Sequence, residues 1–420
     1  MNKRFITSLL ALPLAISSAF AQDLSSAPTV KISGFGTGAL TLSDTDQAEF
    51  SRPNQASGVR KSARTGVDSN LGLQAGVEIN QWLSGTVQGL VRKNAEDGYG
   101  ADLSWAFAKI KLSDRFSVRV GRMGLPVFMI SDYRNVGYAN TMLRPPAEVY
   151  SQVPFDTIDG VDGTFQHNIG DTTVTAQLAL GKTKQTLNAG GALVHLETKL
   201  LTALNVVAEH GPLTVRVGHA RTKASIEDSV PLNTLLAGLR GAGAGYKIAQ
   251  LAPLADALSV KDKQTTFSSA GAILDWNNVL VQTEYAKRKT DTYINDTSSW
   301  YLMAGYRIGK FLPYASHGSL KSTRIVANTV PAACPAGYPA ACTPTLQALS
   351  AGVTRLSTTG SQGQQKTDTI GVRWDFHRSA ALKVQIDRIT PQHGQGLFLV
   401  PAASFSGPVK VGAVAVDFVF

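Results

Sequence analysis

The chain has 420 residues, of which 40 are Lys or Arg and 30 are Asp or Glu, so its formal net charge is +10. Its hydrophobic fraction of 43% lies slightly below that of an average soluble protein, and no run of about 18 apolar residues follows the N-terminal segment. These values exclude a bundle of transmembrane helices, but they leave a β-barrel open, because polar and apolar residues alternate along barrel strands.

The first residues have the composition of a secretory signal. Two basic residues (Lys3 and Arg4) precede an apolar run over 5–16, which is followed by Ala19-Phe-Ala21. A basic start, an apolar segment and a small-residue site predict a signal peptide over 1–21. A retained membrane helix is excluded because the apolar run is too short to span.

The mature chain over 22–420 keeps an excess of positive charge. An excess of positive charge often indicates a protein that binds nucleic acid, but an exported protein rarely encounters nucleic acid. We therefore expect no nucleic-acid partner, and attraction to small anions or to acidic lipid headgroups instead.

Alternating apolar and polar residues recur along the mature chain. In 71–79, for example, every second residue from Leu71 to Ile79 is apolar. Period-two alternation over segments of this length predicts strands with one apolar face. Sixteen such segments follow one another: 28–42, 71–79, 84–92, 104–112, 116–123, 160–167, 172–181, 200–209, 213–222, 266–275, 279–289, 299–308, 311–320, 366–376, 380–390 and 408–420.

The connections between these strands alternate between very short turns and longer loops. This asymmetry and the even number of strands are typical of an outer-membrane barrel, whereas a soluble β-sandwich does not show the regular alternation. The sequence therefore predicts an all-β fold, a transmembrane antiparallel β-barrel of sixteen strands. A barrel of this size leaves an aqueous channel instead of a packed core.

The connection over 124–159 has an unusual composition for a loop. It contains five Phe or Tyr residues and a stiff Arg144-Pro-Pro146 step. A loop this long is either disordered or functional, and its aromatic residues argue against disorder. We expect an ordered loop that folds into the barrel mouth and narrows the pore. Its charged residues are the candidate constriction residues: Asp132, Arg134, Arg144, Glu148, Asp156 and Asp159.

Basic residues fall on the polar side of several predicted strands. A charge on the lipid side near the bilayer midplane costs roughly 2–4 kcal/mol, so these residues are expected to face the lumen. We hypothesise a basic wall that faces the acidic loop and weakly favours anions. Its members are Lys109, Lys111, Arg119, Arg216, Arg307, Arg373 and Lys383.

Cys334 and Cys342 bracket a Pro/Ala-rich stretch, for which a local disulfide is favoured over two free thiols. The histidines are scattered, so we expect no metal site and no cofactor. Apolar spacing over 231–258 is compatible with a short helix or with flexible coil. The two longest external loops, over 223–265 and 321–365, also leave surface adhesion open, although composition alone does not support it.

The signal peptide, the sixteen alternating strands and the C-terminal Ala415-Val-Asp-Phe-Val-Phe420 resemble those of Gram-negative outer-membrane porins. In that family the third external loop folds into the lumen, and by order 124–159 is the third external loop here. The resemblance implies a trimer, contact with outer-membrane lipid and lipopolysaccharide, and a terminal Phe420 that the barrel-insertion machinery reads. Gly121–Pro126 together with 144–150 looks closer to a porin-like subgroup than to the classical general porins.

The favoured function is passive diffusion of small hydrophilic solutes across the outer membrane, with a weak preference for anions. The alternative is a channel of the same architecture that is selective for a particular solute, such as an organic acid. A barrel enzyme would need a Ser/His or paired-carboxylate cluster on neighbouring strands, and no such cluster is found, so we expect no enzymatic activity.

Overall fold

The computed structural model describes residues 28–420 except for 190–191, 228, 335–336, 362 and 393. Strands dominate the described chain, and they form one antiparallel sheet with 18 members. The predicted signal peptide over 1–21 lies outside the described residues.

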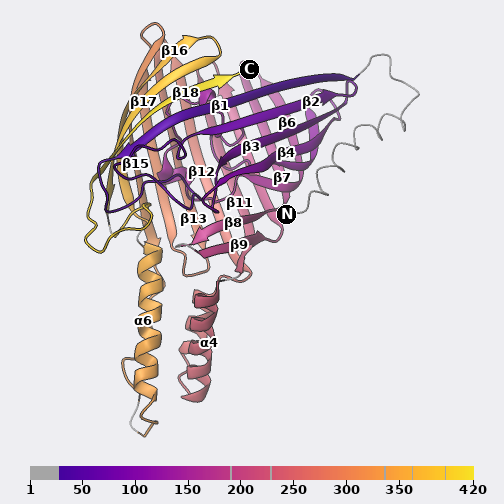
Figure 1. The fold of residues 1–420 in the computed structure, drawn as a ribbon. Helices are drawn as coiled ribbons and strands as arrows, with labels where there is room; N and C mark the ends of the chain where they lie inside the picture. The colour runs from indigo at the N-terminus through magenta and orange to yellow at the C-terminus, as the bar shows by residue number, and fades with distance from the viewer. Residues whose placement is uncertain (1–27, 190–191, 228, 335–336, 362, 393) are drawn as a thin grey trace.

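Sixteen of the strands close into a barrel, as predicted (Figure 1). The first strand pairs with both the second and the last, and β7 pairs directly with β10. The barrel strands are β1 (Thr29–Ser43), β2 (Asn70–Glu78), β3 (Leu83–Lys93), β4 (Tyr99–Lys111), β5 (Phe116–Gly124), β6 (Thr157–Ile169), β7 (Thr172–Lys182), β10 (Leu201–His210), β11 (Leu213–Glu227), β12 (Lys263–Trp276), β13 (Val279–Thr290), β14 (Asp296–Tyr306), β15 (Phe311–Arg324), β16 (Gln365–His377), β17 (Ala380–Pro391) and β18 (Val409–Val419).

Two further strands, β8 (Lys184–Ala189) and β9 (Ala192–Thr198), form a hairpin in a region that we predicted as an external loop. β11 extends beyond its pairing with β10, and its last residues pair with β9 instead. The exposed edge of β11 provides the backbone partners for the hairpin, which the local sequence pattern does not reveal.

Short and long connections lie at opposite ends of the barrel. We term these the turn end, where consecutive strands are joined by a few residues, and the loop end, which carries the long connections. Exposed aromatic rings gather near the turn end, as expected for a girdle at a membrane interface. These rings belong to Trp82, Trp276, Tyr306 and Phe311.

Side chains alternate between two faces of the sheet. On β18, Val414 and Val416 are exposed, whereas Ala415 and Asp417 are buried. We term the face with exposed apolar residues the outer face and the opposite face the inner face. The outer face suits contact with lipid, because burial in a bilayer favours apolar side chains.

Two connections at the loop end contain helices of eight or more residues (Figure 1). The β11–β12 connection contains α4 (Val230–Gly245) and α5 (Leu251–Leu258). Of the two alternatives left open for 231–258, a short helix or flexible coil, the structure therefore has helix, in two pieces. The β15–β16 connection contains α6 (Cys342–Ser361), which we did not predict. These helices share one apolar cluster, which includes Leu239 and Leu346. No helix in the described part of the chain is long and apolar enough to cross a membrane.

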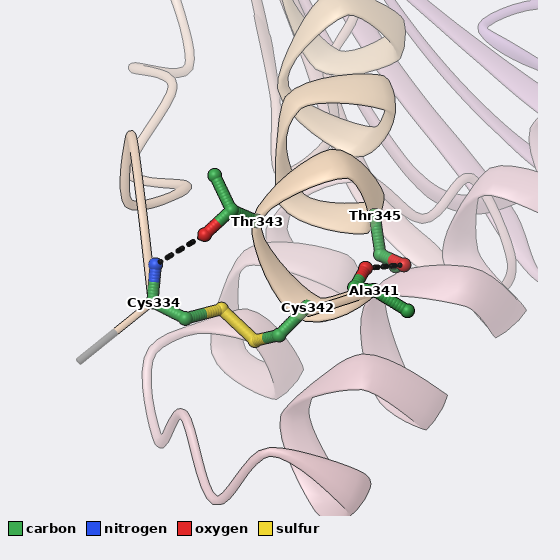
Figure 2. The surroundings of a disulfide bond; sticks show 5 residues. All are labelled: Cys334, Ala341, Cys342, Thr343 and Thr345. Carbon is green, nitrogen blue, oxygen red and sulfur yellow. Dashed lines mark hydrogen bonds between the residues drawn. A yellow bond between two sulfur atoms is a disulfide. The ribbon is translucent and has the colours of Figure 1, made fainter. Parts of the chain in front are cut away.

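The predicted disulfide joins Cys334 to Cys342 at the start of α6 (Figure 2). The Cα atoms of the two cysteines are 6.1 Å apart. The main-chain N–H of Cys334 also donates to the Thr343 hydroxyl at 3.2 Å. Both links tie the preceding coil to the first turn of the helix.

Backbone pairing and aromatic rings close the seam between β1 and β18. Gly34 and Phe420 exchange two backbone hydrogen bonds, of 2.9 and 3.0 Å. A Cβ at Gly34 would lie 2.3 Å from the Phe420 ring, and one at Gly36 would lie 2.5 Å from the Phe418 ring. The terminal rings therefore occupy the space that side chains on β1 would otherwise fill. Phe420 thus has a place in the seam in addition to its predicted role as an insertion signal.

We predict that Gly36→Val destabilises the barrel by roughly 1–3 kcal/mol, because the Phe418 ring must move away from the new side chain. Gly38→Val is the matched control, since a Cβ at Gly38 meets no atom within 4 Å and Val favours strands. Urea unfolding followed by tryptophan fluorescence measures both variants. An equal loss in the two variants would contradict the steric explanation.

Candidate functional site

The connection between β5 and β6, residues 125–156, carries most of the candidate residues. It contains a 3-10 helix, η1 (Gly137–Ala139), and one short helix, α3 (Ala147–Tyr150). The helix begins directly after Pro146, where the missing N–H of proline breaks no helical hydrogen bond. The connection is shorter than the predicted 124–159, because β5 and β6 extend into it at both ends.

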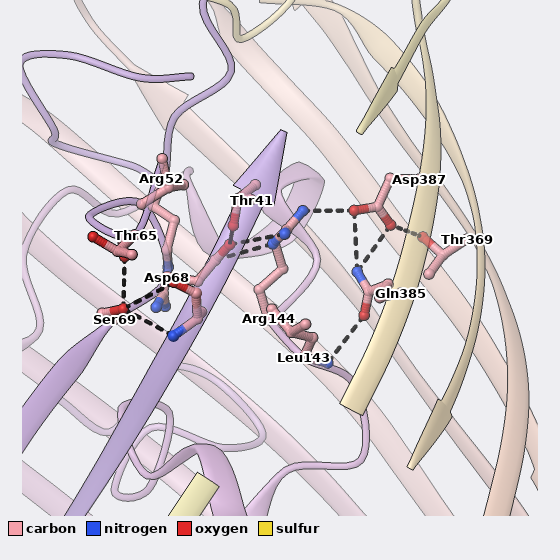
Figure 3. A network of polar contacts seen from close by, with 12 residues as sticks. Thr41, Arg52, Thr65, Asp68, Ser69, Leu143, Arg144, Thr369, Gln385 and Asp387 are labelled. Atoms are coloured by element: carbon pink, nitrogen blue, oxygen red, sulfur yellow. Dashed lines mark hydrogen bonds and ion pairs between the residues drawn. The ribbon is translucent and has the colours of Figure 1, made fainter. Parts of the chain in front are cut away.

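Arg144 joins this segment to two distant parts of the chain (Figure 3). Its guanidinium bonds Asp68 at 2.8 and 3.1 Å and Asp387 at 2.6 Å, and it lies 4.7 Å from the centroid of the Phe50 ring. Only 7% of Arg144 is exposed. The segment is therefore linked to the β1–β2 connection and to β17 by one buried cation.

The two carboxylates that bind Arg144 are also hydrogen-bonded elsewhere. Thr41 donates to Asp68 at 2.7 Å, and Thr369 donates to Asp387 at 2.7 Å. The side-chain amide of Gln385 donates to Asp387 as well, at 2.9 Å. A buried ion pair holds its geometry only when its remaining polar groups find partners, and this network fulfils that condition.

Lys383 holds the middle of the segment through main-chain carbonyls. Its ammonium group lies 2.9 Å from Asp417 and donates to the carbonyls of Gly137 and Asn140 at 2.7 and 2.6 Å. A Cβ at Gly137 would lie 2.0 Å from an Asp417 carboxylate oxygen. Only glycine therefore allows η1 to approach the wall this closely.

Arg373 adds a second contact of the same kind. It donates to the carbonyls of Tyr138 and Asn140 at 2.7 and 2.9 Å, and it forms an ion pair with Asp375 at 2.8 Å. The predicted wall residues Arg373 and Lys383 thus bind the main chain of the segment instead of facing open solvent.

Glu148 on α3 is a buried carboxyl group. It accepts hydrogen bonds from the Gln365 amide, at 2.7 Å, and from the Thr367 hydroxyl, both on β16. Burial raises the pKa of Glu148 above its ordinary value, and its two donors oppose the shift. Glu148 is therefore a structural contact and not a free pore charge.

An aromatic contact joins the end of α3 to the first residues of the segment. The rings of Phe128 and Tyr150 stack at 4.6 Å between centroids, and Phe128 meets Phe267 of β12 edge-on at 5.2 Å. Glu284 of β13 accepts from the Tyr150 hydroxyl at 2.8 Å and from the Met129 main-chain N–H at 3.0 Å.

The segment as a whole contacts the inner face of consecutive strands from β12 to β18. Further contacts come from Ser269 of β12 and Thr297 of β14, while Glu148 also packs against Gly318 of β15. These strand residues alternate with the exposed apolar residues of the outer face. Buried polar contacts and the apolar packing around Phe128 together hold the segment in one position.

Asp156 closes the segment on the side of β3. It binds Arg92 of β3 at 3.1 Å and Arg134 at 3.0 Å. Burial alone would raise its pKa, but the two guanidinium groups hold the pKa of Asp156 well below its usual range. Asp156 therefore stays ionised and is neutralised by its partners.

A basic pocket lies between the segment and the β1–β2 connection. Arg92, Lys93, Arg134 and Arg144 line it together with Arg52, and its lining contains one acid, Asp102. Within the described residues the Arg52 guanidinium has no hydrogen bond or ion pair. Burial, with smaller effects from neighbouring arginines, lowers the pKa of Arg52 to about 10, so it remains charged at neutral pH.

Sequence analysis missed three basic residues of this pocket, which are Arg52, Arg92 and Lys93. Arg92 lies on the polar side of a predicted strand, so strand parity could have identified it. Arg52 lies in a polar connection without periodicity, and no signal in the sequence marks it.

The remaining predicted wall residues lie on the inner face, and most are paired with acids of the wall itself. Arg119 binds Asp162 at 3.0 Å, Arg307 binds Asp275 and Lys111 binds Asp114 at the turn end. The acidic partners are thus supplied by neighbouring strands and turns, and not by the 125–156 segment.

Apart from Glu148, three of the predicted charged site residues have no ion-pair partner in the described chain. Arg216 is buried at 6% exposure, whereas Lys109 and Asp132 are exposed. Lys109 and Asp132 are therefore the two predicted charged site residues that are exposed and have no ion-pair partner in the described chain.

Asp159 is not a residue of the connection. It lies on β6, two residues before the exposed Val161, and so on the outer face. It binds Arg122 of β5 at 2.6 and 2.7 Å, and both side chains are more than a third exposed. The prediction was wrong because β6 begins at Thr157, three residues before the predicted start at residue 160, and strand parity then turns Asp159 away from the inner face.

The family model described as Gram-negative porin matches residues 7–393. Among solved structures, the outer membrane channel DcaP of Acinetobacter baumannii is similar in fold, with a TM-score of 0.54, 9% identity, and coverage of 94% of this chain and 98% of that one. Outer-membrane expressed OmpT of Vibrio cholerae has a TM-score of 0.49 and 12% identity, over 94% of this chain and 99% of that one. A search of proteins with curated functions finds no match.

We predict that Arg144→Ala lowers the free energy of unfolding by roughly 3–5 kcal/mol, because it leaves two buried carboxylates without a cation. Urea unfolding followed by tryptophan fluorescence measures the loss. Adding Asp68→Asn and Asp387→Asn to the same chain should recover part of it.

The control for this prediction is Arg240→Ala on α4, which removes a half-exposed ion pair with Asp256. Its cost should not exceed about 1 kcal/mol. A loss in Arg144→Ala no greater than in this control would show that the buried network does not hold the segment.

Proposed function

Because the chain belongs to the Gram-negative porin family, we propose that it forms a water-filled channel for passive diffusion of small hydrophilic solutes. The 125–156 segment is its constriction. The fold is a closed sixteen-stranded antiparallel barrel of the kind found in outer-membrane channels. A barrel of this width is too large for its own wall side chains to fill.

One observation supports the constriction most directly. Buried charged contacts bind the segment to the inner face of the wall at several points, with Arg144, Lys383 and Glu148 as the main ones. A segment that crosses the opening and cannot swing away narrows the water path permanently. Solutes are then sorted by size and by the charges that remain exposed beside it.

The exposed charges support a weak preference for anions. Four of the five basic residues that line the pocket have acidic partners, which leaves the Arg52 guanidinium, and Lys109 is a further cation without an ion-pair partner in the described chain. Asp132 is the opposing exposed acid of the segment. Basic groups along a pore favour anions, and most of the other wall charges cancel in ion pairs.

The resemblance to porins further supports a homotrimer in the outer membrane, in contact with lipid and lipopolysaccharide, after cleavage of a signal peptide over 1–21. We propose no enzymatic role, because the family and its fold serve as channels.

The first measurement is single-channel conductance in a planar bilayer under a KCl gradient. We expect stepwise openings and a reversal potential that indicates chloride permeating better than potassium. Arg52→Gln or Lys109→Gln should lower the chloride preference and Asp132→Asn should raise it. Each change should be at most about fivefold, since one unit charge in water contributes about 1 kcal/mol at close range.

Lys247→Gln provides the control, because Lys247 is an exposed cation between α4 and α5, outside the barrel wall. A potassium preference in the unmodified protein would contradict the proposed charge assignment. An unchanged reversal potential in Arg52→Gln would exclude the basic pocket as its source.

A second candidate is a channel selective for an organic acid. The basic pocket favours it, because Phe50 and Tyr150 add aromatic surface beside its arginines. Such a site predicts that succinate blocks the ion current in a saturable manner, and that Arg52→Gln raises the half-blocking concentration. An uncharged polyol of similar size serves as control. A current that declines without saturation would leave passive diffusion as the function.

A further inference from the structure

The 125–156 segment turns back at η1, and this tip lies at the turn end of the barrel. The hydroxyl of Tyr138 donates to the main-chain carbonyl of Arg378, in the turn between β16 and β17, at 2.8 Å. The Arg373 guanidinium lies 5.0 Å from the centroid of the Tyr138 ring. The connection therefore starts at the loop end of β5 and reaches the opposite end of the barrel.

After the tip, the chain climbs along the inner face of β17 toward the loop end. The contacts, in order from the turn end, are Lys383 with Met142, Gln385 with Leu143 and Asp387 with Arg144, at 3.2, 3.0 and 2.6 Å. Alternate residues of one strand thus hold successive residues of the segment. Four residues of strand span about 13 Å, so the ascent is long compared with a side chain.

Few residues of the segment face water. Of residues 125–156, Asp132 and Ala139 are exposed, and the others are buried or half-buried. Asp132 lies near the loop end, because its Oδ1 is 3.1 Å from the position that a Cβ on Gly124, the last residue of β5, would take. Ala139 belongs to η1 and lies near the turn end. The two exposed residues thus mark two levels of the water path along the segment.

The charges that hold the tip cancel one another. Lys383 pairs with Asp417 at 2.9 Å, and Arg373 pairs with Asp375 at 2.8 Å. Lys109, near the turn end of β4, is an exposed cation without an ion-pair partner in the described chain. The tip level therefore sorts solutes chiefly by size, with one cation that favours anions.

We propose that the narrowest part of the channel lies at its turn end, and that Ala139 sets the size of the opening there. This inference rests on the proposed channel function. Between the tip and the loop end, both arms of the segment lie against the wall, which leaves the remaining lumen as a vestibule open to the loop end. At the tip, the contacts of Lys383 and Arg373 keep the small side chain of Ala139 beside the water path. Pore diameter decides which hydrated solutes pass, so the residue at this position determines specificity by size.

The first test locates the tip by thiol labelling of the full barrel in lipid vesicles in which one orientation predominates. Both native cysteines are joined in the disulfide, so a cysteine introduced by substitution is the only free thiol. A bulky, membrane-impermeant maleimide is added outside the vesicles, and mass spectrometry counts the labelled fraction. Lys310→Cys in a short turn reports the barrels whose turn end faces outward, and Asn233→Cys on α4 reports those whose loop end does.

We expect Ala139→Cys to be labelled to the fraction found for Lys310→Cys, and Asp132→Cys to the fraction found for Asn233→Cys. Labelling of Ala139→Cys at the loop-end fraction would overturn the proposal. Labelling needs no current, so its outcome is independent of whether the barrel conducts. The absence of openings in the unmodified protein would contradict the proposed function alone.

The second test measures the size of the opening. Ala139→Trp should lower the single-channel conductance by roughly twofold or more, because a bulky ring then enters the narrowest part of the water path. Ala237→Trp on α4 is the matched control, since Ala237 is exposed and lies outside the barrel wall. The control should conduct as the unmodified protein does. Equal conductance in the two variants, both folded by circular dichroism, would contradict the assignment of Ala139.

A third measurement adds charge at the tip after folding, so it does not depend on whether Ala139→Trp folds. A sulfonatoethyl thiosulfonate reagent on Ala139→Cys should lower the chloride preference by at most about fivefold, the effect of one unit charge at close range in water. A trimethylammonium reagent of similar size should raise it. A reversal potential that neither reagent changes at complete labelling would show that permeating ions do not pass the tip.

Discussion

Within a bilayer, a backbone N–H or C=O group has no water to bond, so a sheet that crosses it must leave no free edge. In this chain the constraint is met where β1 pairs with β18 on one side and with β2 on the other. Gly34 and Gly36 have no side chains that would displace the terminal rings of Phe418 and Phe420 from this seam. Closure in turn creates an interior that wall side chains alone cannot fill, and this opens the path for solutes.

A wide interior makes the position of any long connection uncertain unless strong contacts hold it. The 125–156 segment is held by buried charges, each of which has several partners. Arg144 binds two carboxylates, and Lys383 binds one carboxylate together with main-chain carbonyls. Removal of one partner leaves an uncompensated charge in a poorly hydrated site, which is costly. The same ionic chemistry that suggests pore selectivity in the sequence therefore serves mainly to fix the segment.

Charges that carry function are then those that the fold leaves without protein partners. At the pore we propose that these are Arg52, Lys109 and Asp132. A structural charge and a functional charge cannot be distinguished by residue type, because both occur on alternating strands. The distinction lies in whether a neighbouring strand or loop supplies a counter-charge.

The sequence by itself determined the barrel, its sixteen strands, the disulfide between Cys334 and Cys342 and the composition of the third long connection. These features are local: period-two alternation and short turns are written in neighbouring residues. Strand parity also assigned Arg119 and Lys383 to the inner face, but it failed for Asp159, because the start of β6 could not be located within two residues.

Only the tertiary structure decided which charges are paired. Asp68 and Asp387 are separated by more than three hundred residues, and Arg144 meets both because closure brings the β1–β2 connection and β17 close to the same segment. Arg52, by contrast, has no ion-pair partner among the described residues, and nothing in its neighbours along the chain distinguishes it from other loop arginines. Pairing depends on distances across the barrel, and local sequence contains no information about those distances until the sheet has closed.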